Sequence, residues 1–325
     1  MAKDIFAKIS GTGSYLPEKV LSNHDLTQMV DTSDEWITQR VGIKSRHIAG
    51  DKESTSMMAH KAAEAALKDA GLSPKDIGLI IVATGTADYL MPATATLIQH
   101  QLAVPSCPAF DVSAACSGFV YAVDIAKQYI ENRTVKHALV IASERMSRTL
   151  NWQDRATCVL FGDGAGAVVL SQSDTPGIIA SLLHTNGAGL DMLYLKNPLP
   201  DRLGETISKA TSLKMEGNKV FKHAVSSLTR LVTDLLKQSG LKKQDIDWLV
   251  PHQANYRILE LTAKKLNLPM SQVVLTLDQH GNTSAASIPL AIDYARRKNL
   301  ITPGQTILSE AFGAGIVWGG FIAKF

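Results

Sequence analysis

An internal repeat constrains the fold of this chain more than any other feature. At an offset of 169 residues, segment 65–85 aligns with 234–254, and segment 121–126 aligns with 290–295 without a gap. Twelve identities fall among the sixty pairs that begin at 67 and 236. Any two helix–turn–strand units share Leu, Gly and Asp, but one offset that serves two separated blocks favours duplication. The period is too long for a solenoid, so the repeat predicts two similar halves, 1–173 and 174–325.

Within these halves, helical and strand patterns alternate. Good helix formers end at Gly71, a typical C-terminal cap, and the apolar run that follows is typical of a buried strand. This alternation predicts a largely parallel sheet covered by helices. The expected helices of the first half are 56–70 and 116–130, and its expected strands are 77–85, 110–113 and 137–144.

Composition excludes several classes of protein. With 45% hydrophobic and 19% charged residues among 325, the chain can bury a large core and is not intrinsically disordered. A net charge of +3 does not fit a general nucleic-acid binder, although a local basic patch stays open. No apolar run reaches the ~18–20 residues of a membrane span, and the first residues lack the apolar stretch of a signal peptide. Three cysteines without a CxxC fit neither a disulfide scaffold nor a zinc ribbon. We therefore expect a soluble cytoplasmic α/β enzyme.

Cys116 is the first candidate for chemistry. It lies in DVSAACSGF, after a short strand and at the start of an amphipathic helix. The partial positive charge of a helix N-terminus favours thiolate, the nucleophilic form, and the small neighbours leave room for a substrate. The alternative is a small buried hydrophobe, which is also the interpretation for Cys107 and Cys158.

The repeat places two polar residues of the second half opposite apolar or small ones of the first. His252, in WLVPHQAN, aligns with Ala83 at a strand end, and Asn282, in DQHGNTSAASIP, aligns with Ser113 before a helix. A pseudo-twofold fold would bring these strand ends together with Cys116, where α/β proteins place their chemistry. The alternatives are a satisfied core histidine and ordinary turn chemistry next to Gly281.

Metal and nucleotide motifs are weak. There is no HExxH, and His280-x-Asn282 is a poor ligand pair. The stretches GTGS (11–14) and GDGAGA (162–167) do not fit the dinucleotide fingerprint, and close backbone packing explains them as well.

Two further patterns suggest partners. A capping box from Thr32 to Glu35 predicts a helix on which Trp36 and Arg40 lie one turn apart, suited to a nucleotide-like head group. An ordinary amphipathic surface helix is the alternative. After HQAN, three cations share one helical face, which suits an acidic partner, although most charge runs are solvated faces. These cations are Arg257, Lys264 and Lys265.

Five spaced motifs together resemble the β-ketoacyl-acyl-carrier-protein synthase III family, the initiating condensing enzymes of bacterial fatty-acid synthesis. The motifs are DVSAACSGF, FGDGAGAVVL, VPHQAN, DQHGNTSAASIP and EAFGAGIVWG, and the likeness extends to DTSDEWITQRVGIKSRHIA near the start. The resemblance implies a thiolase-like fold, with two duplicated α/β halves in a layered α/β/α/β/α arrangement. It also implies a cytoplasmic homodimer without cofactor or metal, in which acetyl-CoA or another short acyl-CoA and acyl carrier protein are substrates.

The resemblance also implies roles for individual residues. Cys116 would accept the acyl group, and His252 and Asn282 would complete the catalytic set. The backbone N–H groups of Cys116 and Ala314 would form the oxyanion hole, and Met91 and Phe312 would border the acyl pocket. Coenzyme A would contact Trp36, Arg40, Arg155 and Asn255. The carrier protein would contact Lys222, Gln253, Ala254, Asn255, Tyr256, Arg257, Lys264 and Lys265.

Two departures from the family pattern stand out. Ala314 occupies the middle of a usual three-glycine run, where only a backbone N–H is needed, and Met91 stands where relatives often carry Phe, which leaves acyl-chain preference open.

Three rival interpretations also stay open. They are a thiolase or hydroxymethylglutaryl-type synthase, a nucleotide-dependent oxidoreductase that uses the glycine stretches, and a non-catalytic scaffold that binds coenzyme A or a carrier.

Overall fold

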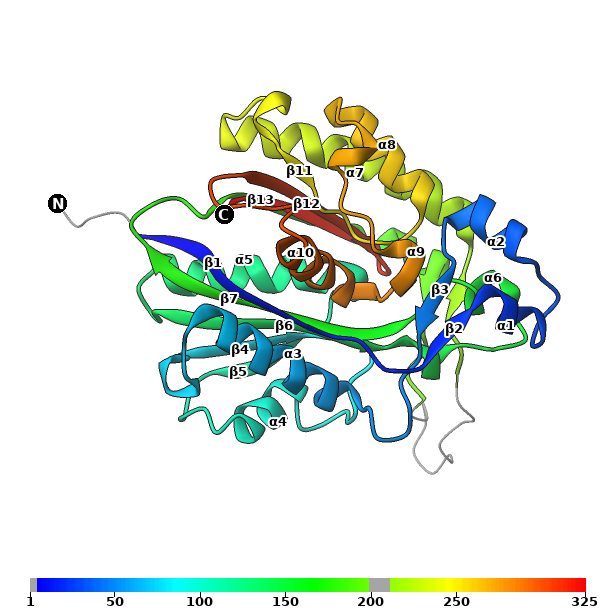
Figure 1. Ribbon diagram of the computed structural model, residues 1–325, viewed down its shortest axis with the longest axis horizontal. Helices are drawn as coiled ribbons and strands as arrows, with labels where there is room; N and C mark the ends of the chain where they lie inside the picture. The colour runs from blue at the N-terminus through cyan, green and yellow to red at the C-terminus, as the bar shows by residue number, and fades with distance from the viewer. Residues whose placement is uncertain (1–4, 199–210) are drawn as a thin grey trace.

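The computed structural model describes residues 5–198 and 211–325, and its elements stack in layers (Figure 1). Helices α3 (Thr55–Ala70) and α4 (Thr94–Gln101) cover the outer face of one sheet, and α7 (Gly217–Ser239) and α8 (Tyr256–Leu266) cover the outer face of the other. Helices α5 (Gly118–Glu131) and α10 (Ser287–Arg297) lie between the sheets. The layered α/β/α/β/α arrangement is therefore confirmed.

Within the described residues, the first sheet has five strands in the order β1-β7-β6-β4-β5. Strands β4, β5 and β6 run parallel, whereas β7 is antiparallel to both β6 and β1. The expected helices and strands of the first half are confirmed to within a few residues. The strand bounds are β1 (Phe6–Tyr15), β4 (Leu79–Ala83), β5 (Ala109–Val112), β6 (His137–Arg145) and β7 (Asp163–Ser173).

Over the part of the chain that the structure describes, the second sheet has four strands in the order β11-β12-β13-β8, of which β11 and β12 are parallel. Its bounds are β8 (Ile178–Thr185), β11 (Trp248–Leu249), β12 (Thr306–Gly313) and β13 (Val317–Lys324). The chain leaves the first sheet at the end of β7 and enters the second at β8. The boundary proposed between 173 and 174 lies in this connection.

Smaller elements surround the two sheets. The remaining strands are β2 (Val20–Ser22), β3 (Ser45–His47), β9 (Leu193–Tyr194) and β10 (Lys214–Met215). The remaining α-helices are α1 (Asn23–Thr27), α2 (Asp34–Val41), α6 (Arg155–Cys158) and α9 (Leu277–His280). The 3₁₀ turns are η1 (Pro74–Asp76), η2 (Ala115–Ser117), η3 (Met146–Thr149), η4 (Gly187–Met192), η5 (Lys243–Asp245), η6 (Met270–Gln272) and η7 (Ser284–Ala286).

The 169-residue repeat is visible in the backbone. Helices α3 and α7 both end at a left-handed glycine, Gly71 and Gly240, and each is followed by a 3₁₀ turn and a parallel strand. Ala115 and Ser284, one repeat apart, share a positive φ of 45° and 52° directly before the two central helices. Non-glycine residues rarely adopt this conformation, so the matched pair marks the same sharp strand-to-helix turn in both halves.

The glycine stretches serve packing. A Cβ atom at Gly13 of β1 would lie 2.3 Å from the carbonyl oxygen of Ala62 in α3, and a Cβ atom at Gly166 of β7 would lie 2.7 Å from the backbone nitrogen of Leu290 in α10. Both stretches therefore bring a strand close to a helix, which accounts for them without a nucleotide.

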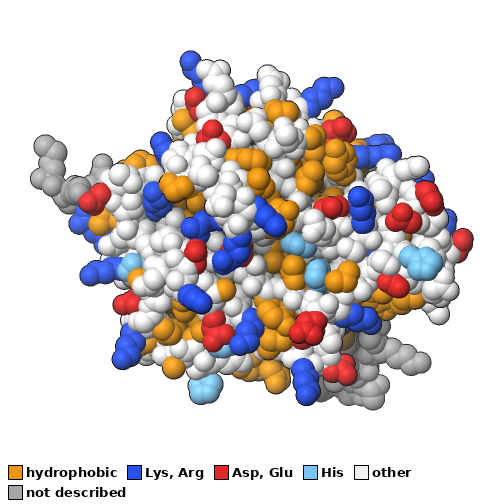
Figure 2. All heavy atoms as spheres, viewed as in Figure 1, with side chains coloured by type: hydrophobic (Ala, Val, Ile, Leu, Met, Phe, Trp, Pro, Cys, Tyr) orange, Lys and Arg blue, Asp and Glu red, His pale blue; other side chains and the backbone are white. Residues whose placement is uncertain are grey.

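Charge is spread over the surface. Figure 2 shows basic and acidic side chains interspersed over the face in view, in keeping with the net charge of +3. None of the described helices is long and apolar enough to cross a membrane.

Candidate active site

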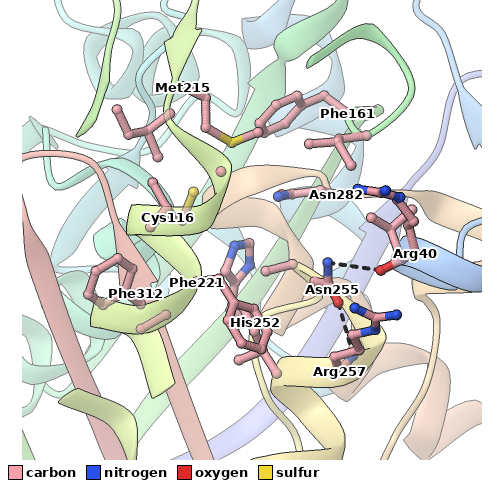
Figure 3. A pocket seen from close by; sticks show the side chains of 18 of the residues that line it. Arg40, Cys116, Phe161, Met215, Phe221, His252, Asn255, Arg257, Asn282 and Phe312 are labelled. Atoms are coloured by element: carbon pink, nitrogen blue, oxygen red, sulfur yellow. Dashed lines mark hydrogen bonds between the residues drawn. The ribbon is translucent and has the colours of Figure 1, made fainter. Parts of the chain in front are cut away.

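Residues of both halves line one cavity of about 420 Å³. Cys116 comes from the turn before α5, His252 from the loop after β11, and Asn282 from the loop before η7. Figure 3 shows the three side chains around a common space, together with Phe312. The structure thus brings Cys116 together with His252 and Asn282, the two residues that the repeat singled out.

Cys116 lies at the start of the central helix, as expected, and is only 8% exposed. The Oγ atom of Ser284 lies 3.5 Å from its Sγ atom. Burial raises the pKa of Cys116 to about 11, although hydrogen bonding from Ser284 acts in the opposite direction. The expectation that the helix N-terminus would favour thiolate is therefore corrected, because desolvation outweighs that effect and leaves a neutral thiol at pH 7.

His252 is held as a neutral hydrogen-bond donor. Burial lowers its pKa to about 4. The Oγ atom of Ser287 lies 2.7 Å from Nδ1 and also accepts the backbone N–H of Gln253 at 3.2 Å. Because that oxygen already accepts, its hydroxyl proton is free to go to Nδ1, which leaves the ring proton on Nε2. The ring, which lines the cavity, can therefore donate into it without carrying charge.

Asn282 is fixed through its carbonyl oxygen. Its Oδ1 atom accepts the backbone N–H of Ser284 at 2.9 Å, and its own backbone N–H donates to the carbonyl oxygen of Leu160. With Oδ1 engaged, the amide NH₂ group is the donor left for the cavity. Gly281, at φ +65°, makes the turn that precedes it, as the sequence indicated.

The turn between β12 and β13 lies against the nucleophile. A Cβ atom at Gly313 would fall 2.8 Å from the backbone nitrogen of Cys116, closer than real Cβ atoms approach a backbone atom. The following residue, Ala314, is half-buried against an apolar cluster that includes the cavity-lining residues Phe161 and Leu193. This contact places the two backbone segments expected to form an oxyanion hole next to each other.

An aromatic side chain and two guanidinium groups share another part of the cavity wall. The Cζ atoms of Arg40 and Arg155 lie 5.0 Å and 5.2 Å from the ring centroid of Trp36. The Thr32–Glu35 capping box is wrong, because α2 begins one residue later and the Oγ atom of Ser33 accepts the backbone N–H of Trp36. The helix itself and the shared face of Trp36 and Arg40 are as predicted.

Asn255 links this wall to α8. Its Nδ2 atom donates to the carbonyl oxygen of Arg40 at 3.4 Å, and its Oδ1 atom accepts the backbone N–H of Arg257 at 2.9 Å (Figure 3). Asn255 therefore caps α8 and adjoins the Arg40 end of the cavity at once.

Of the eight expected carrier-binding residues, four are exposed, three are half-buried and one is completely buried. Lys222, Tyr256, Arg257 and Lys264 are exposed, whereas Ala254, Asn255 and Lys265 are half-buried. Gln253 is completely buried, and its amide bonds to backbone groups of Pro251, Val274, Thr276 and Leu277. Gln253 is thus a structural residue of the loop, and its assignment to the surface is corrected.

The two acyl-pocket residues lie in different surroundings. Phe312 lines the cavity, but Met91 is 83% exposed and does not line it in the single chain. Tyr89 and Leu90 beside it are also exposed, which leaves three consecutive large apolar side chains on the surface.

Sequence reasoning missed several buried polar residues around the site. Ser284 and Ser287 contact Cys116 and His252, and Glu144 contacts Ser284. Glu310 lines the cavity, and burial raises its pKa to about 8. Glu144 lies in none of the quoted motifs. Ser284, Ser287 and Glu310 lie inside quoted motifs, but nothing in their spacing gave them a separate signal. Among the described residues, no cluster of three or more His, Cys, Asp or Glu side chains could hold a metal ion.

Two family profiles match the chain. The one described as "3-Oxoacyl-[acyl-carrier-protein (ACP)] synthase III" matches residues 110–187, and the one described as its C-terminal part matches residues 236–325. These segments contain Cys116 in the first case and both His252 and Asn282 in the second.

Similar proteins cover nearly the whole chain. The β-ketoacyl-[acyl-carrier-protein] synthase III of Methylococcus capsulatus is 51% identical over 98% of this chain and 99% of its own. The synthase III of Aliivibrio fischeri is 53% identical over 99% of this chain and 100% of its own. The crystal structure of the Aquifex aeolicus 3-oxoacyl-[acyl-carrier-protein] synthase III matches with a TM-score of 0.92 and 43% identity, and covers 98% of this chain and 100% of that one.

Proposed function

The chain belongs to the 3-oxoacyl-[acyl-carrier-protein] synthase III family and is a condensing enzyme of fatty-acid synthesis, and we propose the following roles for its residues. The observation that carries the proposal is the convergence of a buried thiol, a neutral imidazole and a primary amide on one cavity. Acyl transfer followed by decarboxylative condensation needs a nucleophile and hydrogen-bond donors, and this set supplies both.

In the first half-reaction, the sulfur of Cys116 attacks the thioester carbonyl of acetyl-CoA or another short acyl-CoA. The carbonyl oxygen becomes negative in the tetrahedral intermediate, and the N–H groups of Cys116 and Ala314 donate to it. The contact of Gly313 with the Cys116 backbone supports this pairing. Collapse of the intermediate expels the coenzyme A thiolate and leaves an acyl-Cys116 thioester.

In the second half-reaction, a malonyl-acyl-carrier protein loses CO₂, and the electron pair of the broken bond forms an enolate at its thioester carbonyl. The Nε2–H of His252 and the NH₂ group of Asn282 donate to the enolate oxygen. Because burial keeps the imidazole neutral above about pH 4, His252 stabilises the enolate oxygen as an uncharged hydrogen-bond donor. The enolate carbon attacks the acyl-Cys116 carbonyl, which gives a 3-ketoacyl-carrier protein and frees the thiol.

Coenzyme A is proposed to bind at the Trp36 wall. The ring offers a face for the base, while Arg40 and Arg155 offer donors for phosphate groups, and Asn255 adjoins Arg40. Carrier protein is proposed to dock on Lys222 of α7 and on the α8 basic face, which consists of Arg257, Lys264 and Lys265. The family resemblance implies that this partner is small and acidic, and exposed cations would raise its rate of encounter.

We also propose that the protein is a cytoplasmic homodimer that uses no resident cofactor. Each subunit would consist of the two halves 1–173 and 174–325. The exposed run of Tyr89, Leu90 and Met91 supports dimerisation, because large apolar side chains grouped on a surface mark interaction sites. In such a dimer Met91 would reach the acyl pocket of the partner subunit and influence which acyl groups fit.

The test is intact mass spectrometry after mixing with acetyl-CoA. We expect one acetyl adduct that maps to Cys116 and is absent from Cys116→Ala. Adding malonyl-carrier protein should then discharge it, whereas acetyl-primed condensation without malonyl groups would favour a thiolase-type reaction. A Cys116→Ala enzyme that still carries the acetyl group would contradict the assignment.

A further inference from the structure

A chain of buried polar groups leads from Cys116 into the protein. The Oγ atom of Ser284 lies 3.5 Å from Cys116 Sγ and 3.1 Å from Glu144 Oε1. Ser284 is 4% exposed and Glu144 is fully buried, and neither lines the cavity. Glu144 stands near the end of β6, so the carboxyl group meets the nucleophile only through the serine hydroxyl.

The hydrogen bonds around Glu144 fix the direction of this chain. The backbone N–H of Gly85 donates to both carboxyl oxygens at 3.2 Å, and the Oγ1 atom of Thr86 donates to Oε2 at 2.5 Å. An ionised carboxylate can only accept, so the single hydroxyl proton of Ser284 goes to Glu144. The same hydroxyl is also placed to donate to Cys116 Sγ, but while its proton is on the Glu144 side the Ser284 oxygen can accept the Cys116 S–H group.

The backbone holds Ser284 in this bridging position. Its φ of +52° is rare for a residue with a side chain, and its N–H donates to Oδ1 of Asn282 at 2.9 Å. The equivalent residue of the first half, Ala115, has the same backbone but no hydroxyl. The backbone conformation thus belongs to the turn of both halves, and in the second half this turn also places a hydroxyl beside the nucleophile.

We propose that Ser284 and Glu144 form the proton path that activates Cys116, an inference that rests on the proposed function of Cys116 as nucleophile. During acylation the S–H bond of Cys116 breaks and the sulfur keeps the electron pair. The sulfur then bonds to the acyl carbon. The proton passes to Ser284 Oγ while the Ser284 hydroxyl proton passes to Glu144. Coenzyme A leaves as thiolate and takes a proton from water. When condensation expels the Cys116 thiolate, the proton returns along the same path. Ser284 contacts the reacting sulfur, and Glu144 is a positioning residue that acts through it.

The titration of Glu144 supports this path. Burial raises its pKa to about 7, so the carboxylate is available as a base above that pH. Its negative charge also raises the pKa of Cys116, and taking up the proton removes this effect as the thiolate forms.

The charged side chains on segments next to Glu144 form hydrogen bonds with groups outside the proposed proton path. Arg145 donates to the carbonyl oxygen of Ala49, Arg148 donates to that of Thr86, and Asp163 accepts from Ser147 and Ala49. The rival base is His252, whose pKa of about 4 would give a rise at much lower pH.

The experiment is single-turnover acetylation by acetyl-CoA from about pH 5 to 9, followed by intact mass spectrometry. We expect the wild-type rate to rise through about pH 7 and then level off. Glu144→Gln and Ser284→Ala should both be about 10²-fold slower at high pH and lose that rise, because each removes the base or its link. The matched control is Ser143→Ala, since this buried hydroxyl of β6 donates to the carbonyl oxygen of Thr55 and not to the path.

Thermal melting shows whether each variant is folded. The pH dependence of the wild-type acetylation rate tests the proposal even if a variant does not fold. A wild-type rate that is already level from pH 5 upward would fit a base with a pKa of about 4, such as His252, and would overturn the proposal. A rise that continues without levelling off at pH 9 would indicate direct ionisation of the thiol and also overturn it. Folded variants that keep the wild-type profile would do the same. Absence of any acetyl adduct on wild-type Cys116 would instead contradict the proposed function itself.

Discussion

Replacing Gly313 by alanine should slow acetylation of Cys116 by about 10²–10³-fold. The new Cβ atom would lie 2.8 Å from the Cys116 backbone nitrogen and 3.3 Å from that of Ser117, and both are backbone atoms held in the turn before α5. Relief of the clash requires the two segments to separate by about half an ångström. Oxyanion-hole donors work within a narrow range of about 2.7–3.1 Å, so this displacement moves the adjoining Ala314 N–H out of reach.

The assay is single-turnover acetylation, with acetyl-CoA affinity measured separately. Affinity should change little, because the coenzyme A head group is proposed to bind at Trp36, away from the altered turn. Gly187→Ala is the matched control, since a Cβ atom there meets nothing within 4 Å and its φ is not positive. If folded Gly313→Ala acetylates Cys116 at the wild-type rate, the placement of the oxyanion hole is refuted.

Three further predictions concern the second half-reaction and the partner. His252→Ala and Asn282→Ala should each slow decarboxylation of malonyl-carrier protein by about 10²–10³-fold while acetylation of Cys116 is affected less, and equal damage to both steps would contradict this division. Ser287→Ala removes the hydroxyl that holds Nδ1 of His252, so condensation should fall by about tenfold or more and acetylation should persist; an unchanged condensation rate would show that the tautomer needs no such partner. Reversing the α8 basic face to Glu should raise KM for malonyl-carrier protein and flatten its salt dependence, since exposed charges are screened over ~8–10 Å, but should leave acetylation by acetyl-CoA almost unchanged. Carrier-dependent condensation that is untouched across a salt series would show that this face is only solvated.

The sequence predicted the fold well because duplication leaves a trace in spacing. One offset located the matched turns, strands and central helices, and the structure shows the same backbone at Ala115 and Ser284. The same alignment drew attention to His252 at a strand end and to Asn282 before a helix, because the first half carries Ala and Ser at these positions. Family resemblance added the coenzyme A and carrier assignments, which spacing alone left open.

The features of the site that the sequence did not predict depend on contacts between distant parts of the chain, which no local sequence pattern encodes. Glu144 lies 140 positions from Ser284 in the chain, yet its carboxyl group is within hydrogen-bonding distance of it. The protonation state of Cys116 was misjudged because the helix N-terminus is visible in sequence, whereas burial of the sulfur is not. Gln253 was placed on the surface for a similar reason, since its motif neighbours are exposed and its own amide is enclosed.

The central claim is that acyl-Cys116 is an intermediate on the path to the 3-ketoacyl product. A pulse–chase measurement tests it most directly: enzyme carrying labelled acetyl on Cys116 is freed of acetyl-CoA and mixed with malonyl-carrier protein and excess unlabelled acetyl-CoA. The account predicts that the label leaves Cys116 and appears in the first turnover of 3-ketoacyl-carrier protein, with one CO₂ released for each acetyl transferred. Product that forms without label while labelled acetyl stays on Cys116 would contradict it.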